Sequence, residues 1–127
     1  MAGPSQHVPK LLERARALLG LPGGPATRLG PAELRRAARA VESLHRGLVA
    51  GRELALAKTY DDPANLGAYL LWWWPQTYAK VRALLQMGRE AGVLPRRAPR
   101  ILDLGSGPAP AATAVLDELG GTAVAMD

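Results

Sequence analysis

Apolar residues recur at helical spacing in two stretches near the start of the chain. Residues 8–19, VPKLLERARALL, predict a short helix that ends at Gly20, and a segment rich in Gly and Pro follows it. Pro31 suits the first turn of a second helix, which we expect to run to Gly51. The apolar stripe of that helix matches the helical repeat and consists of Leu34, Ala37, Ala38, Val41, Leu44 and Leu48.

Arginine side chains gather on another side of this second helix. At about 100° per residue, Arg35, Arg39 and Arg46 share one face, and Arg36 lies nearby. Clustered guanidinium groups can bind phosphates, so these three arginines are candidate RNA-binding residues. A solvated helix surface explains the same pattern equally well.

The aromatic residues are confined to one segment. All three Trp and three Tyr lie between residues 60 and 78, and the chain has no Phe. Asp61-Asp62-Pro63 predicts a helix start, and Trp74-Pro75 predicts a break with a new helix after it, ending near Gly92. Most of these rings are expected in a core. Three consecutive Trp cannot face one way on a helix, so at least one should be exposed and could stack on a nucleic-acid base.

The pattern changes after a linker rich in Pro and Arg. Residues 100–104, RILDL, predict a short strand, and GSGPAP predicts a tight loop of small residues. AATAVLDEL then predicts a helix that stops at Gly120-Gly121, and TAVAMD predicts a second strand. The order strand, glycine loop, helix, strand is typical of the opening of a nucleotide-binding α/β sheet.

Composition and charge narrow the possible settings. Hydrophobic residues make up 48% of the 127, which is enough for a packed core, and no apolar run is long enough to cross a bilayer. The chain has no Cys and its start lacks a secretory pattern, so we expect a cytoplasmic location and no metal site in this segment. All 16 Lys and Arg precede residue 101, together with seven of the 11 acidic residues. The net charge is therefore +9 up to residue 100 and −4 beyond it, which predicts two units with different roles.

The glycine loop excludes two common nucleotide sites. Pro110 stands where the dinucleotide-binding fingerprint needs its third Gly, and the Gly-Lys-Ser/Thr ending of a Walker loop is absent. An acidic residue, Asp103, precedes the first glycine by two positions. Asp127 follows Gly105 by 22 positions, a spacing expected of an acid that binds ribose hydroxyls.

The pattern Asp103-Leu104-Gly105-Ser106-Gly107-Pro108-Ala109 resembles the first motif of class I S-adenosylmethionine-dependent methyltransferases. The resemblance implies that S-adenosylmethionine is the cofactor. It makes five residues candidates for binding the cofactor: Asp103, Gly105, Ser106, Gly107 and Asp127. Ala109 stands where those enzymes usually have a further Gly. A strand–turn–helix with purely structural glycines is the alternative.

The segment upstream adds a second resemblance. Tyr69, Pro75, Thr77 and Tyr78, followed by a helix and ILDLGSGPA, resemble the mitochondrial small-ribosomal-subunit methyltransferase-like family and its bacterial relatives. That resemblance implies association with small-subunit ribosomal RNA or with assembly of the small subunit. It also leads us to expect the aromatic segment beside the cofactor pocket, where the helical part packs against the α/β part.

Together these patterns predict an α/β protein. A basic helical region, residues 1–95, precedes the first β–α–β of a Rossmann-like methyltransferase sheet, residues 96–127. We expect this chain to be the N-terminal part of a methyltransferase-like protein that is inactive alone, with catalytic residues that cannot be named. The alternative is a non-catalytic, basic RNA- or ribosome-binding module with a structural glycine loop.

Overall fold

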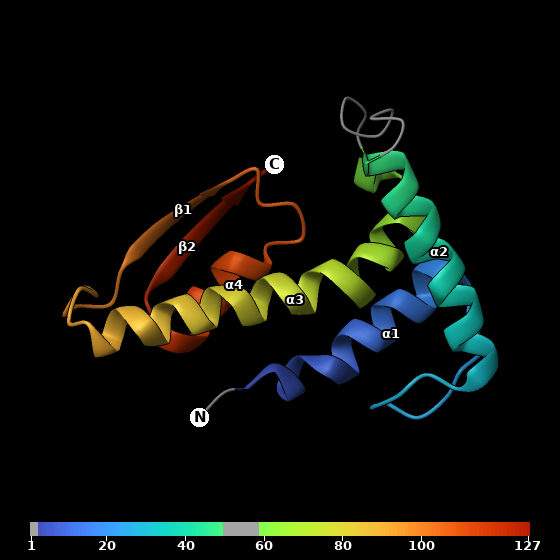
Figure 1. Ribbon diagram of the computed structural model, residues 1–127, viewed down its shortest axis with the longest axis horizontal. Coiled ribbons are helices and arrows are strands. Elements are labelled where there is room, and N and C mark those ends of the chain that lie inside the picture. The colour runs from blue at the N-terminus through green and yellow to red at the C-terminus, as the bar shows by residue number, and fades with distance from the viewer. Residues whose placement is uncertain (1–2, 50–58) are drawn as a thin grey trace. The chain divides into compact units, whose positions relative to one another are not determined.

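The computed structural model describes residues 3–49 and 59–127 (Figure 1). Four α-helices are present in this part of the chain: α1 (Val8–Leu19), α2 (Pro31–Val49), α3 (Pro63–Glu90) and α4 (Pro110–Leu119). Two strands, β1 (Arg100–Leu104) and β2 (Thr122–Met126), and two short 3₁₀ helices, η1 (Pro4–His7) and η3 (Thr59–Asp61), complete it. The predicted mixture of helix and strand is confirmed at this level, and the structure is mostly helical. The predicted end of the second helix at Gly51 lies outside the described residues.

The chain divides into two compact units. The helical unit is Ser5–Trp73, and the glycine-loop unit is Trp74–Asp127 together with the described N-terminal residues Gly3 and Pro4. Helix α3 contributes its first turns to the helical unit and the rest to the glycine-loop unit. The six aromatic rings are shared in the same way, because only Trp74 and Tyr78 belong to the glycine-loop unit.

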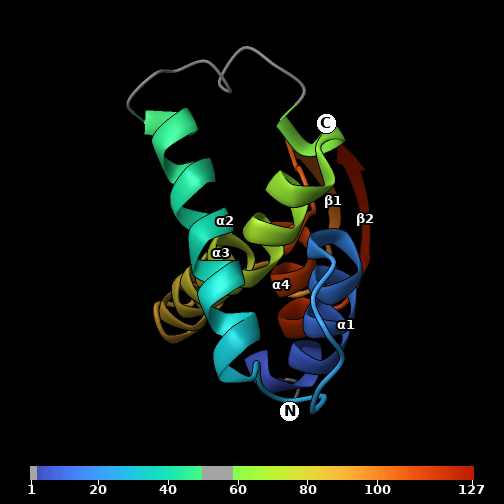
Figure 2. The same ribbon diagram turned by 90° about the vertical axis from the view of Figure 1, so that its right-hand side faces the viewer.

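In the helical unit, α1 ends where the sequence predicts. Gly20 adopts the left-handed conformation with φ of 59°, which glycine reaches without steric cost, and its N–H donates to the Arg16 carbonyl. The connection to α2 contains neither helix nor strand (Figure 2). Arg16 crosses this connection to Glu33 in the first turn of α2. The unit's core is built from small and branched side chains: Leu12, Ala15, Ala37, Leu44 and Ala68.

Helix α3 begins at the predicted cap and approaches α1 closely. The Asp62 carboxylate accepts a hydrogen bond from the Ala64 N–H at 2.8 Å, as a capping acid does. Two turns later, Gly67 is buried against Leu18 and Leu19 of α1. A Cβ at residue 67 would lie 2.7 Å from Leu19 Cγ, so glycine is what allows the two helices to come this near.

The predicted break at Trp74-Pro75 is wrong. Helix α3 continues for 28 residues with Pro75 inside it. Proline removes one backbone hydrogen bond and crowds the preceding turn, which usually interrupts a helix at a cost of about 3 kcal/mol. Here Trp74 and Tyr78, on either side of the proline, are 6% and 0% exposed. We attribute the continuous helix to the packing of these two rings, which offsets the cost of the proline.

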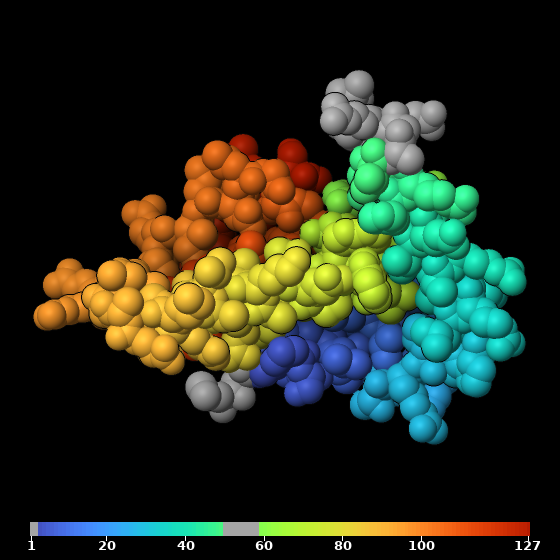
Figure 3. All heavy atoms as spheres, in the orientation of Figure 1, coloured from blue at the N-terminus to red at the C-terminus, as the bar shows by residue number. Residues whose placement is uncertain are grey.

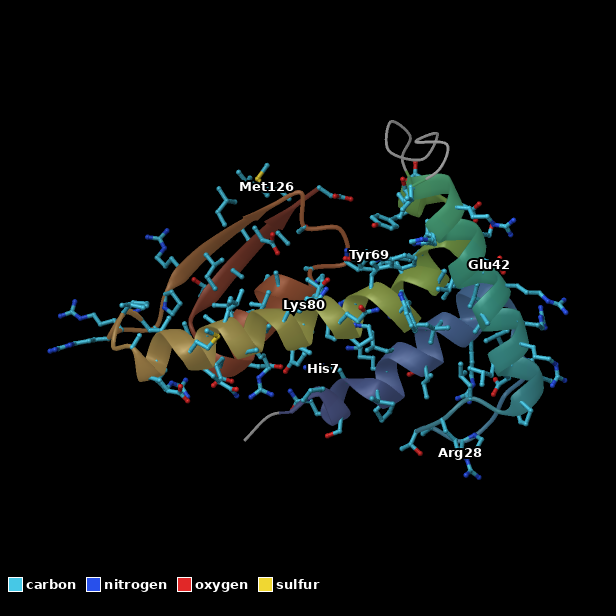
Figure 4. The ribbon with its side chains drawn as sticks, viewed as in Figure 1. His7, Arg28, Glu42, Tyr69, Lys80 and Met126 are labelled. Atoms are coloured by element: carbon cyan, nitrogen blue, oxygen red, sulfur yellow. The ribbon has the colours of Figure 1, made fainter. Side chains whose placement is uncertain are left out.

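In the glycine-loop unit, β1 and β2 pair in parallel and α4 connects them. Leu102 pairs with Val124, and Leu104 pairs with Met126. These four side chains share one face of the two-stranded sheet and are 53–69% exposed, whereas α4 packs against the strands. Figure 4 shows Met126 directed away from α4. The predicted strand–loop–helix–strand order is therefore confirmed.

Candidate functional site

The loop between β1 and α4 has the backbone that its sequence predicts. Gly105 and Gly107 have φ of 65° and 49°, in the left-handed region that side chains disfavour. A Cβ built at Gly105 would have no atom within 4 Å, so the space beside this glycine is open. A ligand could therefore come close to the backbone at this position.

Ala109 takes the same conformation as the two glycines. Its φ is 55°, and it is the only described non-glycine residue with positive φ. This backbone costs a residue with a Cβ about 1–2 kcal/mol. Ala109 thus adopts a glycine-like geometry at the position where methyltransferases of class I usually have a glycine. Its carbonyl accepts the Thr113 hydroxyl at 2.8 Å, which anchors the loop to α4.

The two candidate acids accept hydrogen bonds from this loop and from the helix that follows. Asp103, near the end of β1, accepts from the Ala112 N–H at 3.3 Å. Asp127, directly after β2, accepts from the Gly107 N–H at 3.2 Å. Carboxyl ends of adjacent parallel strands meet at one edge of a sheet, so the structure brings both acids to the glycine loop. Two amides that could otherwise cradle a phosphate already have carboxylate partners.

Ser106 is held inside the loop and is 9% exposed. Its N–H donates to the Met126 carbonyl at 2.9 Å, its carbonyl accepts from the Ala109 N–H at 2.9 Å, and its hydroxyl lies 3.3 Å from the Gly107 carbonyl. These bonds tie the loop to β2 and close its turn. Among the five candidates, Ser106 has the most evident structural role.

Two aromatic residues of α3 support the loop from behind, a relation that sequence reasoning missed. The Trp74 indole N–H donates to the Pro108 carbonyl at 3.1 Å, and the Tyr78 hydroxyl donates to Asp117 of α4 at 2.6 Å. The two rings stack with centroids 5.2 Å apart. A polar handle on a buried ring was the available signal, because such groups usually find a partner.

A buried ion pair fixes the same helices to each other. Arg82 of α3 and Glu118 of α4 are 2.7 Å apart, with side chains 11% and 3% exposed, and Arg89 also reaches Glu118 at 3.0 Å. The hydrogen bond with Glu118 raises the pKa of Arg82. Burial, followed by the hydrogen bond with Asp117, raises the pKa of Tyr78 above its ordinary value. These groups are therefore a support for the loop with their protons held in place.

The candidate RNA-binding arginines lie in the helical unit. Arg35, Arg39 and Arg46 are exposed on α2, and Arg46 lies 3.7 Å from the exposed Glu42 of the next turn. Arg36 instead donates to the Leu19 carbonyl at 3.3 Å. The structure confirms that the three arginines share one exposed side of the helix.

Neither a metal nor a membrane site emerges from the residues that the structure describes. Within 3–49 and 59–127, no three His, Asp or Glu side chains are grouped so as to hold a metal ion. No helix of that part is both long enough and apolar enough to span a bilayer. No family model, no curated protein and no solved structure matches the chain, so its own geometry carries the assignment of function.

Proposed function

We propose that the glycine loop binds S-adenosylmethionine and that the chain belongs to a methyltransferase-like protein. The observation that carries the proposal is the pair of acids at the glycine loop. Asp103 and Asp127 accept from loop and helix amides at the carboxyl ends of adjacent parallel strands. This is the edge where open α/β sheets bind their ligands.

The chemistry of the site suits this cofactor better than a phosphorylated nucleotide. S-adenosylmethionine has a sulfonium, an ammonium and ribose hydroxyls, which carboxylates attract or accept hydrogen bonds from. Phosphates would instead meet two negative groups that already occupy the amides of Gly107 and Ala112. When bound, the cofactor supplies an electrophilic methyl group. Asp127 would accept from the ribose hydroxyls, Asp103 would face the amino-acid end, and Gly105 would leave room for close approach.

The target is part of the same proposal. The resemblance to small-ribosomal-subunit methyltransferase-like proteins suggests small-subunit ribosomal RNA, or its assembly, as the setting in which the protein acts. The net charge of +9 up to residue 100 supports a polyanionic partner. Assignment of the strand pair to a Rossmann-like methyltransferase sheet, starting near residue 96, belongs to this proposal as well.

The test compares two glycines of the same conformation. Gly105 and Gly92 have φ of 65° and 69°, and a Cβ at either would have no atom within 4 Å. Gly105→Val and Gly92→Val therefore impose the same backbone strain and the same added volume, but only the first falls in the loop. In a calorimetric titration with S-adenosylmethionine, we expect Gly105→Val to weaken binding at least tenfold and Gly92→Val to leave it unchanged.

Equal affinities for S-adenosylmethionine in both variants would contradict the proposal. Adenosine triphosphate provides a second comparison, since a phosphate cradle would bind it and the two acids should repel it. If the chain binds RNA with strong salt dependence and binds no S-adenosylmethionine, the alternative holds: a non-catalytic basic module in which the glycine loop is only a turn.

A further inference from the structure

The helical unit contains an apolar groove that the cofactor proposal does not use. Its volume is about 700 Å³. Helix α2 provides most of its wall, and α1, the connection before α2, and α3 provide the rest. The residues that line it are Leu12, Leu29, Leu34, Ala37, Ala38, Val41, Glu42, His45, Leu71 and Trp72.

Large apolar side chains in this groove are left in contact with water. Leu34 is 58% exposed and Trp72 is 54% exposed, although the periodic stripe of α2 predicts Leu34 in a core. Single exposed apolar residues are common, but a continuous apolar groove is typical of a binding surface. Along α2 the lining runs from Leu34 to His45, which is about 16 Å or three helical turns.

Arginines border one side of this groove. Successive residues turn by about 100°, so Arg35, Arg39 and Arg46 lie next to the lining positions Ala38 and Glu42 on the helix surface. All three are exposed (Figure 3 shows the side chains of α2 projecting at the surface). Glu42 lies near Arg46 and projects away from the helix in Figure 4. The rim is thus basic while the floor is apolar.

The apolar floor favours a protein helix over RNA. Glu42 and His45 are the ionisable residues among the ten that line the groove, and the other eight are Leu, Ala, Val and Trp. Bases placed there would lose water from their polar edges without gaining partners, which is costly. The apolar stripe of an amphipathic helix has no such groups and fits a groove of this length with anchors on successive turns.

We propose that this groove binds an amphipathic helix of a partner protein that carries acidic residues along one side of its apolar stripe. The stripe fills the floor between α2 and Trp72. The acids face Arg35, Arg39 and Arg46, which select the orientation of the helix and discriminate against basic helices. The proposal goes beyond cofactor binding, and it holds whether or not the glycine loop takes S-adenosylmethionine.

Three fluorescein-labelled synthetic peptides of 18 residues test the proposal by anisotropy with the 127-residue chain. The first is an amphipathic helix with Leu at i, i+3, i+4 and i+7 and with Glu along one flank. The second has Lys in place of Glu, and the third has the first composition in scrambled order. We expect saturable binding of the Glu peptide, at least tenfold weaker binding of the Lys peptide, and no binding of the scrambled peptide.

Two matched variants locate the site. Leu34→Asp places a carboxylate on the floor, and Leu84→Asp makes the same change at a leucine that is 65% exposed in the glycine-loop unit. Because both leucines are already solvated, both variants should fold, as circular dichroism would verify. We expect Leu34→Asp to weaken binding of the Glu peptide about tenfold or more and Leu84→Asp to leave it unchanged.

Three outcomes would overturn the proposal. The first is no saturable binding of the Glu peptide, and the second is equal binding of the Glu and Lys peptides. The third is binding of a single-stranded uridine oligonucleotide that Leu34→Asp weakens and that displaces the peptide, since the groove would then be an RNA site. A change of Arg35 and Arg39 to Gln should also abolish the preference for Glu over Lys without abolishing binding.

Discussion

Each of the two units is held together by one buried arginine–glutamate pair, but the pairs secure different things. Arg16 and Glu33 are 2.8 Å apart in the helical unit, and Arg82 and Glu118 are 2.7 Å apart in the glycine-loop unit. In both pairs the carboxylate is 3–4% exposed. Removing one partner would leave an uncompensated buried charge in either unit.

The first pair joins two helices, whereas the second stands behind a loop. Glu33 also accepts from the Gly30 N–H, so it fixes the start of α2 and leaves the rest of that helix to present its groove and its arginines. Glu118 is instead joined by the Tyr78–Asp117 and Trp74–Pro108 bonds, which follow α4 up to the glycine loop. The comparison teaches that one unit offers an open surface and the other a supported loop.

The largest effect is expected for the acid at the loop itself. Asp127→Ala should weaken binding of S-adenosylmethionine roughly 10- to 150-fold, because the loss of a charged acceptor costs about 1.5–3 kcal/mol. Asp127→Asn keeps an acceptor oxygen for the Gly107 N–H and separates loop geometry from charge. Asp61→Ala, an exposed acid of the helical unit, is the control. An unchanged calorimetric affinity in folded Asp127→Ala would place the ribose site elsewhere.

A second large effect is expected where the helical unit is most tightly packed. Gly67→Val should destabilise the protein by about 1–3 kcal/mol, since its Cβ must displace Leu19. Gly23→Val is the matched control, because a Cβ there meets no atom within 4 Å and its φ is not positive. Urea denaturation followed by circular dichroism measures both. Equal stabilities would mean that α1 and α3 can separate without cost, and the contrast with the open groove would fail.

A smaller effect tests whether the glycine loop depends on α3. Trp74→Phe keeps the stacked ring but removes the donor to the Pro108 carbonyl, and it should lower the free energy of unfolding by about 1 kcal/mol. Trp73→Phe, which retains a ring beside His45 and Tyr69 in the helical unit, is the control. Denaturation curves compare the two variants. If Trp73→Phe proved the more destabilising, the loop would not rely on this support.

Alkaline pH should distinguish the two units further. Tyr78 has its pKa raised by burial and by the hydrogen bond with Asp117, so its stabilising contribution is complete below the ordinary tyrosine pKa of about 10. That contribution is lost as the pH rises from this value through the folded-state pKa, by at most about 1.4 kcal/mol per pH unit. Tyr78→Phe should flatten the decline of stability above pH 10, whereas Tyr60→Phe should not. Parallel declines in both variants would contradict the assignment.

Most of the elements could be predicted from the sequence, and the misses have physical causes. Positions that depend on the backbone alone were predictable: Gly20 ends α1, Asp62 caps α3, and Gly105 and Gly107 turn the loop. The uninterrupted α3 was not, because tertiary packing of its neighbours decided the conformation around Pro75. Periodicity likewise predicts that Leu34 belongs to an apolar stripe, but it does not show whether the stripe is covered.

The candidate site divides along the same line. The placement of Asp103 and Asp127 at the loop follows from strand order and spacing. The support from Tyr78, Arg82, Asp117 and Glu118 does not, because those pairs join residues 36 and 39 positions apart. Pairing at such distance is a property of the folded chain, and no local pattern announces it.

The smallest effect on stability, and the sharpest test of the open surface, concerns the arginines of α2. Replacing Arg35, Arg39 and Arg46 with Gln should leave the fold intact, because Gln forms helices about as well as Arg and the exposed Arg46–Glu42 pair contributes little. If RNA binds this face, each lost phosphate contact removes counterion release. The slope of log affinity against log salt should then become shallower by about 2 to 3 in the triple variant. Fluorescence anisotropy with a small-subunit ribosomal RNA fragment, measured from low to high salt, compares the variant with the original chain. Coincident slopes would show that RNA does not use these side chains, leaving them free to form the basic rim that we propose for an acidic helix.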